Sequence, residues 1–315
     1  MRRSVGRGAL IMALVLCTAV AQAQTVPPET LFLGRANDLG NTTYVDNISQ
    51  GRDDNPARLF DRGRQAGIKG GRIADRVLPD LQMLYAQGTS PVSKRWMVQL
   101  AGTRLTGSGP FGPGTLSYRD KDAGLQVAYR AGNRLDFGVG VADIETVSQI
   151  KVGGIGGFTL TSQPRGLGGR VGARYRLSPR IELEGTYDHY GDAERTVPLG
   201  AFAPLGESTA VFTTQKMVVG GSYRAKGIEA AMFYTKLDID QRGGPFSLGK
   251  NFLNGGVKAT HGPFYLAAGM YDGYGSVGAG MARGKTSLTV AASNRNKAFS
   301  PTAKTAYYAE AVRGF

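Results

Sequence analysis

The stretch GGRVGARYRLSPRIELEGTYDHY, Gly168 to Tyr190, decides the fold that this sequence predicts. Apolar and polar residues alternate on both sides of a three-residue loop, Ser178, Pro179 and Arg180, as expected for a β-hairpin with one apolar and one charged face. The register of such a hairpin sets opposite charges across the two strands: Arg176 opposite Glu182, Arg174 opposite Glu184 and Arg170 opposite Asp188. A hairpin of this kind suits a β-sandwich or a β-barrel, and the rest of the chain decides between them.

The first 23 residues have the features of a secretory signal peptide. A basic start precedes an apolar run from Ala9 to Val20, and Ala21 and Ala23 give the small-residue pattern of a cleavage site. The run is too short to span a bilayer as a helix. We therefore expect export and cleavage after Ala23. The chain's one cysteine, Cys17, lies in this leader, so the mature protein would have no disulfide and no cysteine-ligated metal site.

The composition favours one large β-domain over two ordinary domains. The 315 residues include 47 glycines, about twice the usual share of about 7%, and many lie inside alternating segments where a flat soluble sheet would be weakened by them. The formal net charge is +14. Because an exported protein seldom meets nucleic acid, we expect no nucleic-acid partner and favour anionic partners such as phosphate-rich lipopolysaccharide or small anionic solutes.

From Lys94 onward, about a dozen segments of about ten residues alternate between apolar residues and small, polar or charged ones. They are joined alternately by tight turns and longer polar loops, and no helical pattern is long enough to cover their apolar face. We therefore predict an all-β protein with a single antiparallel transmembrane β-barrel of about 14 strands, within a range of about 12 to 16. Residues 24–93 form an N-terminal segment with weak strands and a charged loop or plug, and residues 94–315 form the main part of the barrel.

The last ten residues, AYYAEAVRGF, end in Phe315, with Tyr307 on the same face of the strand. This stretch resembles the closing strand of Gram-negative outer-membrane β-barrel proteins, although Arg313 stands where the pattern prefers an apolar residue. The resemblance implies that Phe315 and Tyr307 belong to a signal read by the barrel-assembly machinery. It also implies that the protein lies in the outer membrane, in contact with its lipid and lipopolysaccharide.

The segment 51–76, rich in glycine and in both charges, has two interpretations. It forms either a solvated loop or a loop folded into the barrel lumen, where Arg58, Arg62 and Arg64 would narrow a pore.

Sequence motifs for chemistry are weak. Gly273, Gly275 and Gly278 match a dinucleotide fingerprint by spacing, but they do not open a helix, and we expect no cofactor. The two histidines are His189 and His261. His189 and Asp188 are neighbours on a strand and so point to opposite faces, which leaves no catalytic pair. We predict no enzyme and no metal site.

The function that we predict from the sequence is a porin-like diffusion channel for small hydrophilic, preferentially anionic solutes. The residues expected to line its lumen carry charge: Arg170, Arg174, Arg176, Glu182, Glu184, Asp188, Lys216, Arg224 and Lys258. The same charges also suit a wall held together by ion pairs, and therefore a non-conducting structural or assembly-coupled barrel with a filled lumen. A hydrolase at the barrel rim is a third alternative.

Overall fold

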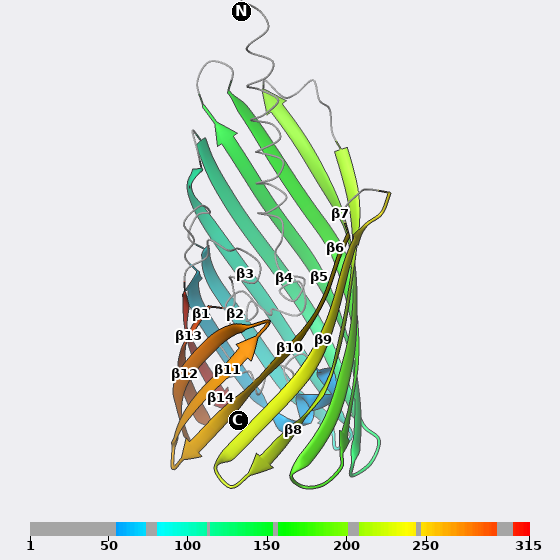
Figure 1. Cartoon of the computed structure of the whole chain (residues 1–315), viewed down its shortest axis with the longest axis vertical. Coiled ribbons are helices and arrows are strands. Elements are labelled where there is room, and N and C mark those ends of the chain that lie inside the picture. The colour runs from blue at the N-terminus through cyan, green and yellow to red at the C-terminus, as the bar shows by residue number, and fades with distance from the viewer. Residues whose placement is uncertain are drawn as a thin grey trace, which may run out of the picture.

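The structure is a computed structural model of the whole chain, drawn in Figure 1. It describes residues 55–73, 81–111, 114–153, 157–200, 208–243, 247–294 and 305–315. The leader, with its expected cleavage after Ala23, lies outside the described residues. No helix among the described residues is long and apolar enough to cross a membrane.

The described residues form one short 3-10 helix and fourteen strands. In chain order these are η3 (Pro56–Asp61), β1 (Gln65–Ile73), β2 (Leu81–Ser93), β3 (Trp96–Phe111), β4 (Gly114–Arg130), β5 (Leu135–Val152), β6 (Phe158–Arg176), β7 (Ile181–Gly200), β8 (Ser208–Ala225), β9 (Ile228–Gln241), β10 (Ser247–His261), β11 (Phe264–Tyr271), β12 (Tyr274–Arg283), β13 (Thr286–Ser293) and β14 (Ala306–Gly314).

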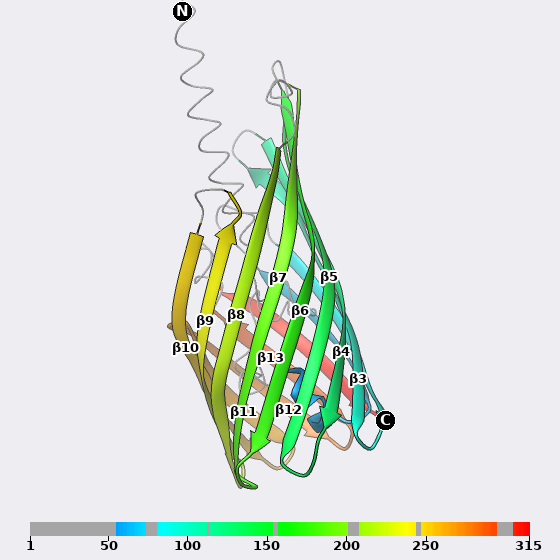
Figure 2. The ribbon, with the colours of Figure 1, turned by 90° about the vertical axis from the view of Figure 1, so that its right-hand side faces the viewer.

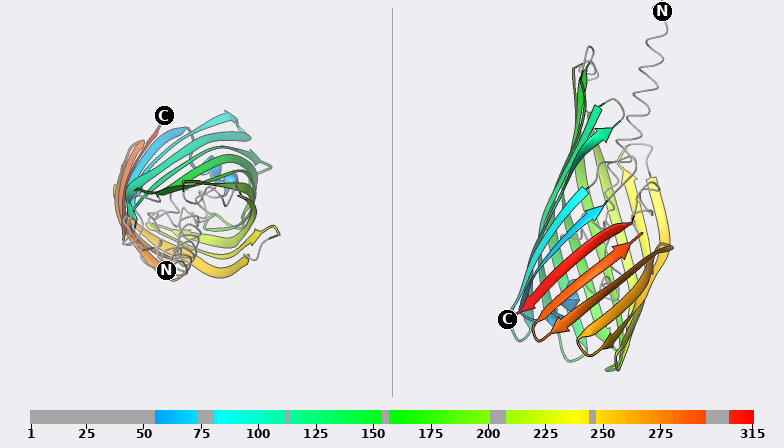
Figure 3. Two further views of the ribbon diagram at one scale, coloured as in Figure 1. Left: turned by 90° about the horizontal axis from the view of Figure 1, so that it is seen from above. Right: turned by 90° about the vertical axis from the view of Figure 1, so that its left-hand side faces the viewer.

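Each strand is hydrogen-bonded to its neighbours in sequence, and β14 pairs antiparallel with β1, so the sheet closes into a barrel. Seen from above, the strands form a ring (Figure 3, left). Closure leaves no unpaired sheet edge, which is the condition for a β-structure to cross a lipid bilayer. The predicted all-β barrel of 14 strands is confirmed.

The hairpin that opened the sequence analysis is β6 and β7. Its register is the one that the alternation predicts, with Arg176 beside Glu182 and Arg170 beside Asp188. Around the whole barrel, large apolar side chains point outward. They are exposed in the isolated chain because this face contacts lipid in the membrane. Examples from around the barrel are Leu100, Val139, Val171, Leu183, Met232, Leu253, Leu266, Val277 and Val290.

The wall is much taller on one side than on the other. Strands β11 and β13 have eight residues each, whereas β7 has twenty. At about 3.3 Å per residue and a tilt of about 40°, eight residues rise about 20 Å, close to the thickness of the hydrocarbon layer. The long strands are therefore expected to extend beyond the membrane. In Figure 2 the strands β5 to β8 reach high, whereas β11 to β14 stay low (Figure 3, right).

The barrel begins at Gln65, so β1 and β2 come from the segment 24–93 that the sequence analysis set apart from the main barrel. The described residues before β1 form η3, which lies inside the barrel near the end where tight turns join the strands, and it packs against β3 to β6. Of the two interpretations of segment 51–76, the loop inside the lumen fits residues 55–61.

Candidate functional site

The helix η3 is specified locally by the sequence NPARLFD. The side chain of Asn55 caps the helix by accepting a hydrogen bond from the backbone N–H of Ala57 at 3.0 Å, and Pro56 follows at the first helical position, where its missing N–H costs nothing. Leu59 is 1% exposed and packs with Met97 and Ala128 of the inner wall. We call residues 55–61 the plug.

Arg58 fixes the plug to β7, the strand next to those that the plug packs against. Its Nε and Nη2 donate to the two carboxylate oxygens of Glu184 at 2.7 and 2.6 Å, and its Nη1 donates to Glu182 at 2.6 Å. The side chain is 1% exposed. Burial alone would lower the pKa of Arg58, but the attraction of Glu184, Glu182 and Asp61 outweighs it and raises the pKa. Arg58 is therefore a buried cation whose charge is matched by fixed carboxylates.

A second set of contacts holds the two ends of the plug. The amide of Asn55 donates to the carbonyl of Ala173 at 3.0 Å and to Glu184 at 3.1 Å. At the other end, Asp61 accepts a hydrogen bond from Arg174. Because charge-assisted hydrogen bonds at buried sites are strong and specific, the plug has a defined place in the lumen.

Asp136 forms ion pairs with three arginines near the plug. It is 0% exposed and accepts from Arg174 and Arg176 at 2.5 Å and from Arg130 at 3.1 Å. The guanidinium of Arg130 in turn lies 4.1 Å from the centre of the Phe60 ring, a cation–π contact with the plug. One carboxylate of β5 thus binds arginines of both neighbouring strands, β4 and β6.

Two glycines of the wall make room for the plug. A Cβ at Gly138 would overlap the backbone of Pro56 and Ala57, and a Cβ at Gly172 would overlap the side chain of Asn55. These positions sit opposite each other on β5 and β6. The close approach of backbone to backbone is a specific reason for glycine here, beyond the general curvature of the wall.

The charged residues expected to line the lumen are engaged with partners. Arg170 binds Asp188 at 2.5 and 2.8 Å, and Lys216 lies 3.7 Å from the same carboxylate. Arg224 pairs with Glu229 at 3.1 Å, and Lys258 lies over the ring of Tyr265 at 4.1 Å. The remaining five, Arg174, Arg176, Glu182, Glu184 and Asp188, take part in the contacts described above. The lumen is polar, but its charges are largely matched.

The other sequence candidates lie on the wall. Tyr307 points outward from β14 and is 65% exposed, and the backbone N–H of Phe315 donates to the carbonyl of Arg64 at 2.9 Å, at the β1–β14 seam. Asp188 is buried inside the barrel, whereas His189 is exposed on its outer face. His261 is exposed at the tight-turn end of β10.

Farther from the turns than the plug, part of the inner wall is apolar. Phe233 and Leu237 of β9 and Phe252 of β10 face inward and are buried. Ile239 packs on the pair Leu237 and Phe252, and Val218 of β8 packs on Phe233. Sequence reasoning treated these segments as wall and missed that their inward face is largely apolar, although Phe233, Leu237 and Ile239 lie on one face of the alternation in MFYTKLDI, with Thr235 between them.

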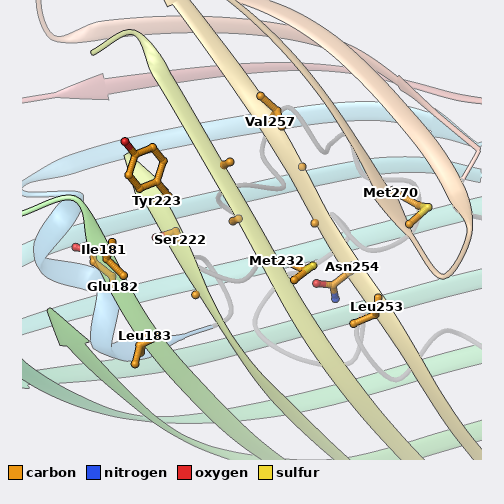
Figure 4. Close-up of a pocket in the computed structure, with 15 residues that line it drawn as sticks. Ile181, Glu182, Leu183, Ser222, Tyr223, Met232, Leu253, Asn254, Val257 and Met270 are labelled. Carbon is orange, nitrogen blue, oxygen red and sulfur yellow. The ribbon is translucent and has the colours of Figure 1, made fainter. Parts of the chain in front are cut away.

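The outer face of the same strands has a hollow of about 570 Å³, drawn in Figure 4. Its rim is made of large apolar side chains from β7 to β11: Leu183, Tyr223, Met232, Leu253, Val257 and Met270. Gly221 and Gly255 form its floor, because neither carries a side chain. A Cβ at Gly255 would come within 2.5 Å of the carbonyl oxygen of Ala231. The hollow lies on the outer face of the barrel, which faces lipid.

Comparison with solved structures identifies the class of protein. No family model matches the chain, and no curated protein matches it in sequence. In structure it is similar to a Pseudomonas aeruginosa FadL homologue, with a TM-score of 0.55 and 11% identity over 83% of this chain and 93% of that one. It is also similar to the toluene transporter TodX of P. putida, with a TM-score of 0.52 and 11% identity over 90% of this chain and 95% of that one.

These likenesses establish the fold. Together with the closed barrel and its outward apolar belt, they define an outer-membrane β-barrel protein, as the closing strand of the sequence indicated.

Proposed function

We propose that the protein is an outer-membrane channel for small apolar molecules, with a lumen closed to free diffusion at its tight-turn end. The observation that carries the proposal is the plug, which Arg58 holds against Glu182 and Glu184 inside the barrel. A barrel with a purely structural role would not need a separate segment folded into its lumen. A channel that admits selected molecules without leaking does need one.

The inner wall supports an apolar solute. The inward side chains of Phe233, Leu237 and Phe252 make this part of the inner wall apolar, and an apolar molecule gains about 25 cal/mol for each Å² that it removes from water. The similar structures support the same choice, because TodX is described as a toluene transporter and, in a deletion mutant, as a monoaromatic hydrocarbon channel.

The hydrophilic, anion-selective pore that the sequence suggested has less support. Anion selectivity needs positive charge in excess along the lumen, but Arg170 is paired with Asp188 and the arginines near the plug share Asp136. The plug, which lies against β3 to β7, also takes up part of the space that water and ions would use.

Uptake measurements in whole cells test the proposal. Cells that produce the protein should take up radiolabelled toluene faster than cells with an empty vector, while uptake of labelled sucrose stays the same. Leu237→Asp should slow toluene uptake severalfold, because a hydrated carboxylate replaces an apolar surface in the passage. The matched control is Lys236→Gln, one residue away on the outward face. Faster sucrose uptake with unchanged toluene uptake would contradict the proposal.

The second candidate is a non-conducting barrel with a filled lumen, favoured by the completeness of the ion-pair network around Asp136. It predicts that neither solute enters faster than in control cells, although the protein is present and folded in the outer membrane.

A further inference from the structure

A group of charged side chains faces outward from β3 to β6 at the upper margin of the apolar belt. Below it, the same strands expose Leu100, Leu125, Val139 and Val141 to lipid. The charged residues that follow on this outer face, all exposed, are Arg104, Arg119, Lys121, Asp143, Glu145 and Arg165. We call these six residues the outer charged cluster. Four are cations and two are carboxylates.

The height of the cluster is set by the strands. Arg104 lies about eight residues along β3 from Trp96, and Lys121 is at a similar distance from the tight-turn end of β4. At about 3.3 Å per residue and a tilt of about 40°, this distance corresponds to about 20 Å of height, in the upper part of an apolar band of about 25 Å, from which long charged side chains reach the headgroups. In barrels of this kind the tight turns face the periplasm. The cluster therefore lies where the headgroups of the outer leaflet begin.

The four cations of the cluster outnumber its two carboxylates, so its charge is only partly balanced within the protein. Arg104 and Lys121 stand directly opposite each other on β3 and β4, an arrangement of like charges that destabilises a sheet in the absence of an anion. Arg165 lies 3.7 Å from Asp143, and Glu145 is the residue opposite Lys121. Neither Arg104 nor Lys121 makes an ion pair within the parts of the chain that the structure describes.

The surface beneath the two cations is hollowed and apolar. Leu84, Ala86, Gly102, Thr103 and Ala123 line a depression of about 420 Å³ on the outer face, together with the charged residues Arg104, Lys121, Asp143 and Glu145. Small residues at the bottom leave space for a hydrocarbon chain, and the two cations lie at its headgroup end. The depression thus combines the two features that a phosphorylated lipid requires.

We propose that the outer charged cluster is a binding site for a phosphorylated glycolipid of the outer leaflet. Its phosphate lies between Arg104 and Lys121, and an acyl chain lies on the small residues below. Arginine suits this role because its planar guanidinium donates two parallel hydrogen bonds to phosphate oxygens, and lysine adds a compact charge. The bound phosphate removes the repulsion between the two facing cations. The proposal depends on the position of the cluster in the membrane and not on the solute that the channel carries.

Binding of purified, refolded protein to bisphosphorylated lipid A tests the site, with dephosphorylated lipid A and inorganic phosphate as comparison probes. The wild-type protein should bind bisphosphorylated lipid A most tightly. The double variant Arg104→Gln, Lys121→Gln should bind it about thirtyfold more weakly, since each cation near a charged membrane surface contributes about fivefold. The conservative double variant Arg104→Lys, Lys121→Arg keeps both charges and should retain most of the affinity.

The matched control is the double variant Lys94→Gln, Lys226→Gln, which removes the same charge from exposed tight turns at the opposite end of the barrel. It should bind lipid A as the wild type does, and each variant is first shown to be folded by its heat-modifiable gel mobility. The proposal is overturned if the Arg104→Gln, Lys121→Gln variant binds as tightly as the wild type, or if the control loses as much affinity as that variant. Equal binding of phosphorylated and dephosphorylated lipid A, or binding of inorganic phosphate alone, overturns it as well.

Discussion

Replacing Arg58 by alanine should loosen the plug. The substitution removes all three hydrogen bonds to Glu182 and Glu184 and leaves a carboxylate, Glu184, that is 3% exposed in its side chain without its cation. Breaking a buried ion pair by removing one partner costs about 3–5 kcal/mol. With a factor of ten for each 1.4 kcal/mol or so, the population with a displaced plug should rise by about 10² to 10³.

The expected effect is smaller than this upper value, because other contacts of the plug remain. Asn55 still donates to the carbonyl of Ala173, and Leu59 still packs on Met97 and Ala128. Arg174 also still binds Asp61 at the other end of the plug. We therefore expect a rise of about tenfold or more in the displaced population, below the value for a pair broken alone.

A single cysteine can report the displacement. Cys17 lies in the expected leader, so a Met97→Cys substitution gives the mature barrel one thiol, placed on the inner wall under Leu59. Its reaction with a water-soluble maleimide should be slow, and Arg58→Ala should accelerate it at least about tenfold. The control is Arg62→Ala, which loses a bond to Gln87 from a half-buried residue and should change the rate little. Equal labelling rates with and without Arg58 would refute the idea that Arg58 holds the plug in place.

Three further predictions concern the barrel and its plug. The refolded protein should migrate faster on a gel before boiling than after it, because a closed hydrogen-bonded barrel resists unfolding; identical mobility would argue against the barrel. Deleting Phe315 should lower the yield in the outer membrane more than it lowers the stability of protein refolded in vitro, as the resemblance of the closing strand implies; an unchanged yield would remove that signal. Gly138→Leu should displace the plug and accelerate labelling of the cysteine at position 97, whereas Gly132→Leu, at a position with open space, should not; equal rates would show that the plug is not pressed against this wall.

The architecture was predictable because a barrel repeats one simple pattern. Residues 168–190 contain the two-residue strand period, the short loop and the charge pairing in one hairpin. A shift of the strand register by one residue would turn the charged face of the hairpin toward lipid, so the register is well specified. The same logic applied to each later hairpin, and it led to a closed barrel with the observed number of strands.

The plug could not be derived in the same way. The contacts of Arg58 span more than a hundred residues of sequence, and no local pattern specifies that this arginine meets Glu184. The motif NPARLFD predicts a short capped helix from local sequence alone. The same motif would suit a helix in solvent as well as one inside a lumen. The role of Asp136 was hidden for a similar reason, since its partners Arg130, Arg174 and Arg176 lie on two neighbouring strands and meet only in the closed wall.

The charges of the lumen show why the anion selectivity predicted from the sequence has little support in the structure. Counting residues on the inward face gives an excess of cations, and that count suggested anion selectivity. In the folded chain, the arginines around the plug share carboxylates, and Arg58 adds a further cation that binds two of them. The field inside a lumen depends on which charges are paired, which is set by contacts between distant strands.

The conductance of the wild-type protein in a planar lipid bilayer tests the central claim most directly, because it reports whether water and ions pass the lumen. We predict that the refolded protein inserts without a steady open-channel conductance, since the plug and its ion pairs with Glu182 and Glu184 close the tight-turn end. A stable conductance that rises in proportion to salt concentration and passes small sugars would contradict this account, because it would require an open, water-filled lumen where the plug is placed.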